Sequence, residues 1–139
     1  MLGAIMVSHG KLSKGLKDSV EMISGRQKNI KTVSLNEGDG LEYLKESILI
    51  KYRELKCDCD DVLIFVDMFG ATTFNSACLV CVEENCCLIT GMNLPLILTF
   101  CVHQENYSLK EMIDALSDAS QEDFKIVTRE LLKGGTTCQ

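Results

Sequence analysis

The sequence predicts an α/β fold: a doubly wound, mostly parallel four-stranded sheet in the order 2-1-3-4, with helices on both faces. Short apolar runs alternate with longer segments in which apolar residues recur at helical spacing, which gives the order β-α-β-α-β-α-β. The first and third runs are apolar at nearly every position, as in parallel strands buried on both faces. Right-handed crossovers between such strands put helices on both sides of the sheet.

The first half of the chain contributes two strands and two helices. Residues 2–7 are almost entirely apolar and predict the first strand, which ends at the tripeptide SHG over 8–10. Leucine, valine and isoleucine then recur at helical spacing over about 11–24. The run IKTVSL over 30–35 predicts the second strand, and a turn-rich loop leads from it to an amphipathic helix over 41–55.

The second half continues the alternation and adds a terminal segment. Ser108 is expected to cap a last amphipathic helix, with Glu111 three residues on as in a capping box. Apolar and polar residues alternate over 124–129, which favours a short edge strand over another helix. We expect one domain over 1–133 and a flexible tail over 134–139. The elements before Ser108 are a buried strand over 62–66, a loop over 68–73, a helix over 74–83, a strand over 86–90 and a helix to about 103.

Composition and charge narrow the class of protein. The chain has 139 residues, of which 46% are hydrophobic, and this suits one domain with one core. Its net charge of −6 argues against nucleic acid or an anionic membrane as a partner, because either would call for a basic face. No apolar stretch is long enough to insert in a membrane, and the N-terminus lacks the pattern of a signal peptide. We therefore expect a cytoplasmic protein.

Eight cysteines are many for a chain of this length. Without an export signal, reduced thiols inside apolar helices and strands are a better interpretation than a disulfide framework. Cys57 and Cys59, or Cys78 and Cys81, could suggest a metal site, but neither pair has a well-spaced second pair to complete four ligands. We expect no metal and no cofactor, and we expect Cys138 in the tail to be incidental.

Polar and turn residues follow three of the predicted strands. The first strand leads to His9, the third ends at Asp67, and the fourth is followed by residues 91–95. In a sheet of order 2-1-3-4 the first and third strands are neighbours, and the ligand crevice opens between them at their carboxyl ends. His9 and Asp67 should face each other there. The second histidine, His103, lies in an apolar helix and is expected to be structural.

A histidine beside a carboxylate can act as a nucleophile that carries a phosphoryl group. The carboxylate accepts a hydrogen bond from one imidazole nitrogen, which fixes the tautomer and frees the other nitrogen. Backbone N–H groups at helix starts bind phosphate. Each residue alone has an ordinary structural explanation, and the functional interpretation depends on their co-location. The expected phosphate-binding residues are Gly10, Lys11, Gly70, Ala71, Thr72 and Thr73, the two threonines also through their hydroxyls.

Three motifs in this order make the chain resemble a known family. They are SHG over 8–10, VDMFGATTFN over 66–75 and GMNLP over 91–95. The chain resembles, over nearly its whole length, the IIA domain of the mannose–fructose–sorbose class of the bacterial sugar phosphotransferase system. The resemblance implies a doubly wound fold and a homodimer in which a C-terminal strand is exchanged between subunits.

The resemblance also implies a role for each matching residue. His9 would accept a phosphoryl group from the phosphocarrier protein HPr and donate it to the cognate IIB domain during sugar uptake. Asp67 would orient His9, and Thr72 falls where the family has a hydroxyl residue near the phosphate. The family often has a second glycine where Ala71 stands and a proline where Thr73 stands, so the hydrogen bonds of this loop are left open.

Other functions remain open at this point. The phosphotransfer subunit of a dihydroxyacetone kinase also uses a histidine after the first strand. A non-catalytic regulatory module could use the same fold, and the cysteines leave room for a thiol-redox or metal protein. Nucleotide binding is not expected, because neither a GxGxxG nor a Walker motif is present.

Overall fold

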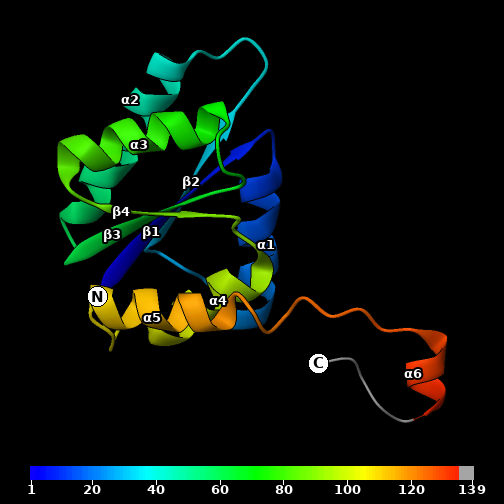
Figure 1. Ribbon diagram of the computed structural model, residues 1–139. Helices are drawn as coiled ribbons and strands as arrows, with labels where there is room; N and C mark the ends of the chain where they lie inside the picture. Colours follow the sequence, from blue (N-terminus) through cyan, green and yellow to red (C-terminus); the bar gives the residue numbers. More distant parts are fainter. Residues whose placement is uncertain (135–139) are drawn as a thin grey trace.

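Four parallel strands form the centre of the molecule in the order β2-β1-β3-β4 (Figure 1). The computed structural model describes residues 1–134. The strand order and the parallel pairing confirm the sequence prediction. The strands are β1 (Leu2–His9), β2 (Ile30–Leu35), β3 (Asp61–Val66) and β4 (Cys87–Thr90).

Helices cover both faces of this sheet (Figure 1). One face carries α1 (Leu12–Ser24), α4 (Leu94–His103) and α5 (Leu109–Ala119). The other face carries α2 (Leu41–Lys56) and α3 (Thr72–Glu84), which pack against each other. Among residues 1–134, no helix combines the length and the apolar character that a membrane crossing requires.

The side chains of the central strands alternate between two core layers. Ile5 and Val7 of β1 pack in the layer under α2 and α3, whereas Ala4 and Met6 pack in the layer under α1, α4 and α5. All four are fully buried, as expected for a strand covered on both faces. This double burial explains why β1 has a continuous apolar run rather than an alternating pattern.

Capping residues fix where the last helices of the body begin. Ser108 and Glu111 form the predicted capping box, each side chain accepting a hydrogen bond from the other's backbone N–H. Asn93 caps α4 by accepting a hydrogen bond from the N–H of Leu96. α3 begins at Thr72, two residues before the start that the apolar spacing predicts, because Thr72 and Thr73 are polar and do not contribute to an apolar period.

The C-terminal prediction of an edge strand is wrong for the chain described here. Residues 124–128 have no regular structure, and α6 (Arg129–Lys133) follows with Thr128 as its cap. The segment leaves the body after α5 and extends away from the sheet (Figure 1). A strand needs the backbone groups of a neighbour, and no other part of residues 1–134 pairs with this segment. Residues 135–139, with Cys138 and most of the predicted tail, lie outside the described part of the chain.

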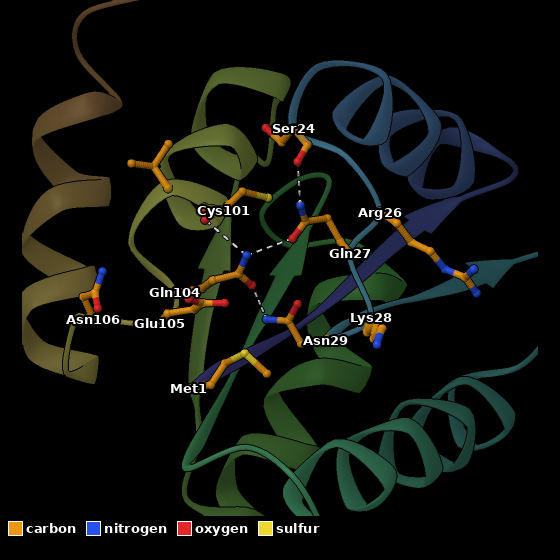
Figure 2. A pocket seen from close by; sticks show the side chains of 11 residues that line it. Met1, Ser24, Arg26, Gln27, Lys28, Asn29, Cys101, Gln104, Glu105 and Asn106 are labelled. Atoms are coloured by element: carbon orange, nitrogen blue, oxygen red, sulfur yellow. Dashed lines mark hydrogen bonds between the residues drawn. The ribbon is translucent and has the colours of Figure 1, made fainter.

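Buried amides join the amino ends of the strands to α4 (Figure 2). Asn29 donates to the backbone carbonyl of Leu2 at 2.6 Å and also to the side chain of Gln104. Gln104 in turn donates to the side chain of Gln27 at 2.8 Å. These amides line a cavity of about 670 Å³ at the end of β1 opposite to His9. Their mutual hydrogen bonds satisfy groups that would otherwise be costly to bury.

The core assignment predicts a specific stability difference. Ile97 of α4 is fully buried, so Ile97→Ala should lower the free energy of unfolding by about 2–5 kcal/mol through lost contacts and a cavity. Ile23, which is exposed near the end of α1, provides the matched control. Ile23→Ala should change the free energy of unfolding by less than about 0.5 kcal/mol. Urea unfolding followed by circular dichroism measures both. Equal effects would contradict the packing of α4 described above.

Candidate active site

The sheet brings the ends of β1 and β3 together at one edge. Val7 of β1 is paired with Val66 of β3, and the N–H of Asp67 continues the ladder by donating to the carbonyl of Val7 at 3.2 Å. His9 is the last residue of β1, and Asp67 directly follows β3. The expected juxtaposition of these two residues is therefore present, and rigid neighbouring strands hold both of them.

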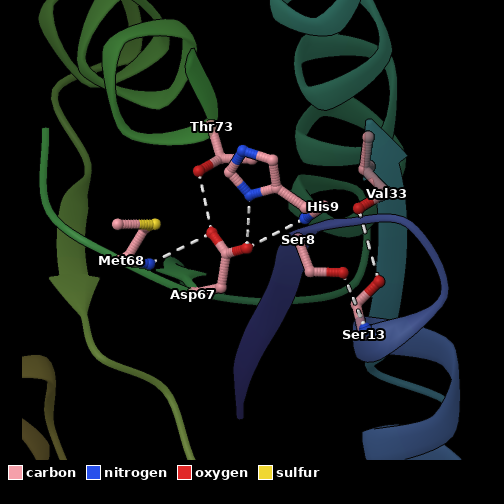
Figure 3. A network of polar contacts seen from close by, with 7 residues as sticks. All are labelled: Ser8, His9, Ser13, Val33, Asp67, Met68 and Thr73. Atoms are coloured by element: carbon pink, nitrogen blue, oxygen red, sulfur yellow. Dashed lines mark hydrogen bonds and ion pairs between the residues drawn. The ribbon is translucent and has the colours of Figure 1, made fainter. Parts of the chain in front are cut away.

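His9 and Asp67 are in direct contact (Figure 3). Nδ1 of His9 lies 2.7 Å from Oδ2 of Asp67, and the backbone N–H of His9 donates to the same oxygen at 2.9 Å. The side chain of Asp67 is only 10% exposed, whereas that of His9 is 50% exposed. The carboxylate is thus enclosed, and the imidazole remains open to a molecule from solution.

Both oxygens of Asp67 accept hydrogen bonds. Besides the two from His9, Oδ1 accepts from the N–H of Met68 at 3.0 Å and from the hydroxyl of Thr73 at 2.8 Å. Burial alone would raise the pKa of Asp67, but the hydrogen bonds from His9 and Thr73 outweigh it and lower this pKa below its usual value. Asp67 is therefore an ionised acceptor near neutral pH.

An ionised carboxylate fixes the tautomer of the imidazole. A carboxylate can only accept, so Nδ1 of His9 carries the hydrogen that joins it to Asp67. In the neutral ring, Nε2 then keeps its lone pair. Figure 3 shows Nε2 directed away from Asp67. The arrangement presents one nucleophilic nitrogen in a fixed orientation.

Ser8 supports His9 from the buried side of the strand end. Its hydroxyl oxygen accepts a hydrogen bond from the N–H of Ser13 at 2.7 Å, which satisfies one free donor in the first turn of α1 (Figure 3). Ser8 and Ser13 are both fully buried. Residue types alone do not predict the hydrogen bond between Ser13 and Ser8, because Ser8 lies before Lys11, which occupies the N-cap position of α1.

Glycines shape both loops of the site, but one of them has a different role from the one expected. Gly10 was predicted to bind phosphate, yet its N–H donates to the carbonyl of Leu35 at 2.8 Å and is already in use. Gly10 has a φ of +55° and Gly70 has a φ of +82°, a backbone conformation that glycine adopts without strain. Their contribution is to turn the chain from a strand end into a helix start.

The starts of α1 and α3 leave backbone donors available. Within residues 1–134, the N–H groups of Lys11, Ala71, Thr72 and Thr73 have no acceptor. Thr73 differs from its expected role, because its side chain is fully buried and its hydroxyl donates to Asp67 rather than facing the open side. Thr72 is partly exposed, and no hydrogen bond of the described chain engages its hydroxyl. The site therefore combines an exposed nucleophile with unused anion-binding groups.

The second histidine lies outside this site. His103, at the end of α4, stacks on Tyr107 with ring centroids 4.0 Å apart and planes inclined by 6°. This contact agrees with the structural role expected from its position in an apolar helix. Among residues 1–134, no three His, Cys, Asp or Glu side chains gather in a geometry that could hold a metal ion.

Comparison with known proteins gives consistent matches. The family model described as the fructose IIA component of the phosphotransferase system (PTS) matches residues 3–117. The fructose-specific EIIA component of Bacillus subtilis is 31% identical, covering 100% of this chain and 95% of that protein. The sorbose-specific EIIA component of Lacticaseibacillus casei is 30% identical, covering 85% of each protein.

Solved structures support the fold independently. The EIIA component from Streptococcus agalactiae superposes with a TM-score of 0.76 at 21% identity, over 89% of this chain and 95% of that one. The mannose/sorbose-specific IIA subunit from Enterococcus faecalis gives a TM-score of 0.68 at 19% identity, over 91% and 98%. At such low sequence identities, similarity to these structures establishes only the fold, and family membership is shown by the sequence matches. The chain belongs to the mannose–fructose–sorbose family of PTS IIA components, the sugar-specific phosphotransferase components of that system.

Proposed function

We propose that this protein is a phosphoryl carrier of the cytoplasm, which accepts a phosphoryl group from phospho-HPr on His9 and passes it to a cognate IIB domain. One observation carries the proposal: a half-exposed imidazole whose Nδ1 contacts an enclosed carboxylate. Membership of the family supports the choice of donor and acceptor proteins. The sugar is left open, because in this proposal His9 exchanges the phosphoryl group with two proteins and does not contact the sugar.

The transfer follows from the hydrogen bonding of the imidazole. Nε2 of His9 attacks the phosphorus, and the bond between the phosphoryl group and its donor breaks as the Nε2–P bond forms. The hydrogen on Nδ1 stays in place, so the phosphorylated ring carries positive charge beside the negative carboxylate of Asp67. Attack on the same phosphorus by the acceptor protein restores the neutral imidazole.

Backbone groups would hold the phosphoryl oxygens. The unused N–H groups of Lys11, Ala71 and Thr72 lie at helix starts, where the helix dipole favours an anion. The hydroxyl of Thr72 and the ammonium group of Lys11 are further donors. In this proposal Gly10 shapes the loop, and Thr73 positions Asp67 instead of binding phosphate through its hydroxyl.

Exposed apolar side chains beside His9 suit a protein partner. Phe69 is 74% exposed and rests on the ring of Phe74, with centroids 4.6 Å apart. Met68, in the loop after β3, and Leu12, the first residue of α1, are also exposed. Large apolar groups around a reactive residue mark a surface that another protein covers.

A homodimer is part of the proposal. Phe124 is 82% exposed and Ile126 is also exposed, on the segment that extends from the body. The outer edge of β4 has no strand neighbour within residues 1–134, and an apolar cavity of about 290 Å³ lies beside it, lined in part by Leu88 and Ile113. We propose that the segment 124–128 of a second copy adds to this edge as an antiparallel strand.

Replacement of the nucleophile tests the carrier role. His9→Ala should abolish labelling by phospho-HPr, because it removes the Nε2 atom that is proposed to attack the phosphorus. His103→Ala removes the other histidine and should be labelled at the normal rate. Labelling with ³²P measures both, and circular dichroism checks that each variant is folded. Labelled His9→Ala protein would contradict the assignment. If a dihydroxyacetone kinase subunit, and not a IIB domain, removes the label from the phosphorylated wild-type protein, the protein belongs to the dihydroxyacetone kinase system instead.

A second prediction concerns Thr73 as a positioning residue. Thr73→Val removes the hydroxyl that donates to Asp67 while keeping the shape, and the rate of phosphorylation should fall by about 10-fold. Removal of this donor should also move the pKa of Asp67 upward, which ¹³C NMR titration of its carboxyl group reports. Thr73→Ser keeps a hydroxyl and should restore both. An unchanged titration of Asp67 in Thr73→Val would contradict this role.

Sedimentation tests the proposed dimer. The full chain should sediment as a dimer, and a chain that ends at Ser120 should sediment as a monomer. Phe124→Asp with Ile126→Asp should weaken the dimer because two charges would enter an apolar edge. Val82→Asp alters an exposed apolar residue of α3 and serves as the control that leaves the mass unchanged. A monomeric full chain would refute the strand addition.

A further inference from the structure

Two cysteines are in contact at the end of α3 that lies away from the active site. Cys81 is in the last turn of α3, and Cys86 lies just before β4. Asn85 between them adopts a left-handed conformation, with φ of +53°, which turns the chain back toward the helix. The Sγ atoms of Cys81 and Cys86 are 3.1 Å apart, about 1 Å more than a disulfide bond length.

The neighbouring cysteines are arranged differently. Cys86 packs with Leu88 in the core layer under α2 and α3, whereas Ile89 packs in the opposite layer. Because side chains alternate along a strand, Cys87 points to the same side as Ile89 and away from Cys81. Both Cys81 and Cys86 are partly exposed, so a small oxidant can reach them. The geometry thus selects one pair of thiols rather than a larger cluster.

The two thiols differ in acidity. A hydrogen bond from Cys81 stabilises the thiolate of Cys86 and lowers the pKa of Cys86 against the effect of burial. The same hydrogen bond, together with burial, raises the pKa of Cys81. Cys81 also lies at the C-terminal end of α3, where the helix dipole disfavours a negative charge. Cys86 is therefore the thiol suited to react first, with Cys81 placed to follow.

We propose that Cys81 and Cys86 form a reversible dithiol–disulfide site that is oxidised by a hydroperoxide. The thiolate of Cys86 attacks one peroxide oxygen, the O–O bond breaks, and Cys86 becomes a sulfenic acid while the other oxygen leaves as water. The sulfur of Cys81 then attacks the sulfur of Cys86, the S–S bond forms, and a second water leaves. Two thiols lose two electrons and two protons in total, and one hydrogen peroxide becomes two waters. A dithiol reductant reverses the reaction.

This site is independent of the proposed phosphoryl transfer. Cys81 is in the last turn of α3, nine positions after Thr72 and eight after Thr73 in the first turn. At about 1.5 Å per residue, Cys81 lies about 12 Å or more along the helix from the threonines. Disulfide formation can therefore be tested on the wild-type protein whether or not His9 is phosphorylated.

Peptide mapping after mild oxidation tests the proposal directly. The reduced wild-type protein is treated with about one equivalent of hydrogen peroxide, its free thiols are alkylated, and it is cleaved after glutamate. Cleavage after Glu83 and Glu84 separates Cys81 from Cys86. We expect peptides 55–83 and 85–105 to be joined by a Cys81–Cys86 disulfide, with Cys78 and Cys87 alkylated, and to separate after treatment with dithiothreitol.

Two variants identify the sulfur atoms involved. Cys87→Ser is the matched control, because it changes the adjacent thiol on the other face, and its peptides should still be joined. Cys86→Ser should lose the link and leave Cys81 alkylated. The proposal is overturned if wild-type Cys81 and Cys86 both stay alkylated when exposed Cys57 has been oxidised. It is also overturned if the link persists in Cys86→Ser.

Discussion

The contact between the imidazole of His9 and the carboxylate of Asp67 is the interaction on which the rest of the site depends. Asp67 accepts from the ring and the backbone of His9, from the next residue in its own loop, and from Thr73 of α3. These donors keep an enclosed carboxyl group ionised, although burial opposes ionisation. An ionised carboxylate in a fixed place is what gives the imidazole one tautomer and one orientation.

The fold supplies this contact through the strand order. β1 and β3 are neighbours although α1, β2 and α2 separate them in sequence. After β1 the chain continues into α1 on one face of the sheet, and after β3 it continues into α3 on the other face. The first turns of α1 and α3 consequently converge on the same edge. The nucleophile and the anion-binding groups then come from different parts of the chain, while the burial of β1 and β3 on both faces holds them in register.

Much of this arrangement could be predicted from the sequence, and the rest depended on contacts between distant segments. Apolar runs and helical spacing were sufficient for the alternation of strands and helices, and the order 2-1-3-4 of a doubly wound sheet then placed His9 beside Asp67. The N–H of Gly10 was misassigned because its acceptor is the carbonyl of Leu35, which only the pairing of β1 with β2 brings near. The hydroxyl of Thr73 was misassigned because its direction depends on α3 beginning at Thr72. Alternation over 124–128 indicates the ability to form a strand, but a strand also needs a partner.

NMR of the phosphorylated protein tests the central claim most directly. With ¹⁵N in the imidazole rings, the coupling to ³¹P identifies the phosphorylated nitrogen, and the proton on the other nitrogen can be observed in the same sample. The arrangement of His9 and Asp67 predicts phosphate on Nε2 of His9, with the hydrogen on Nδ1 retained. Phosphate on Nδ1, or on any other residue, would contradict the account.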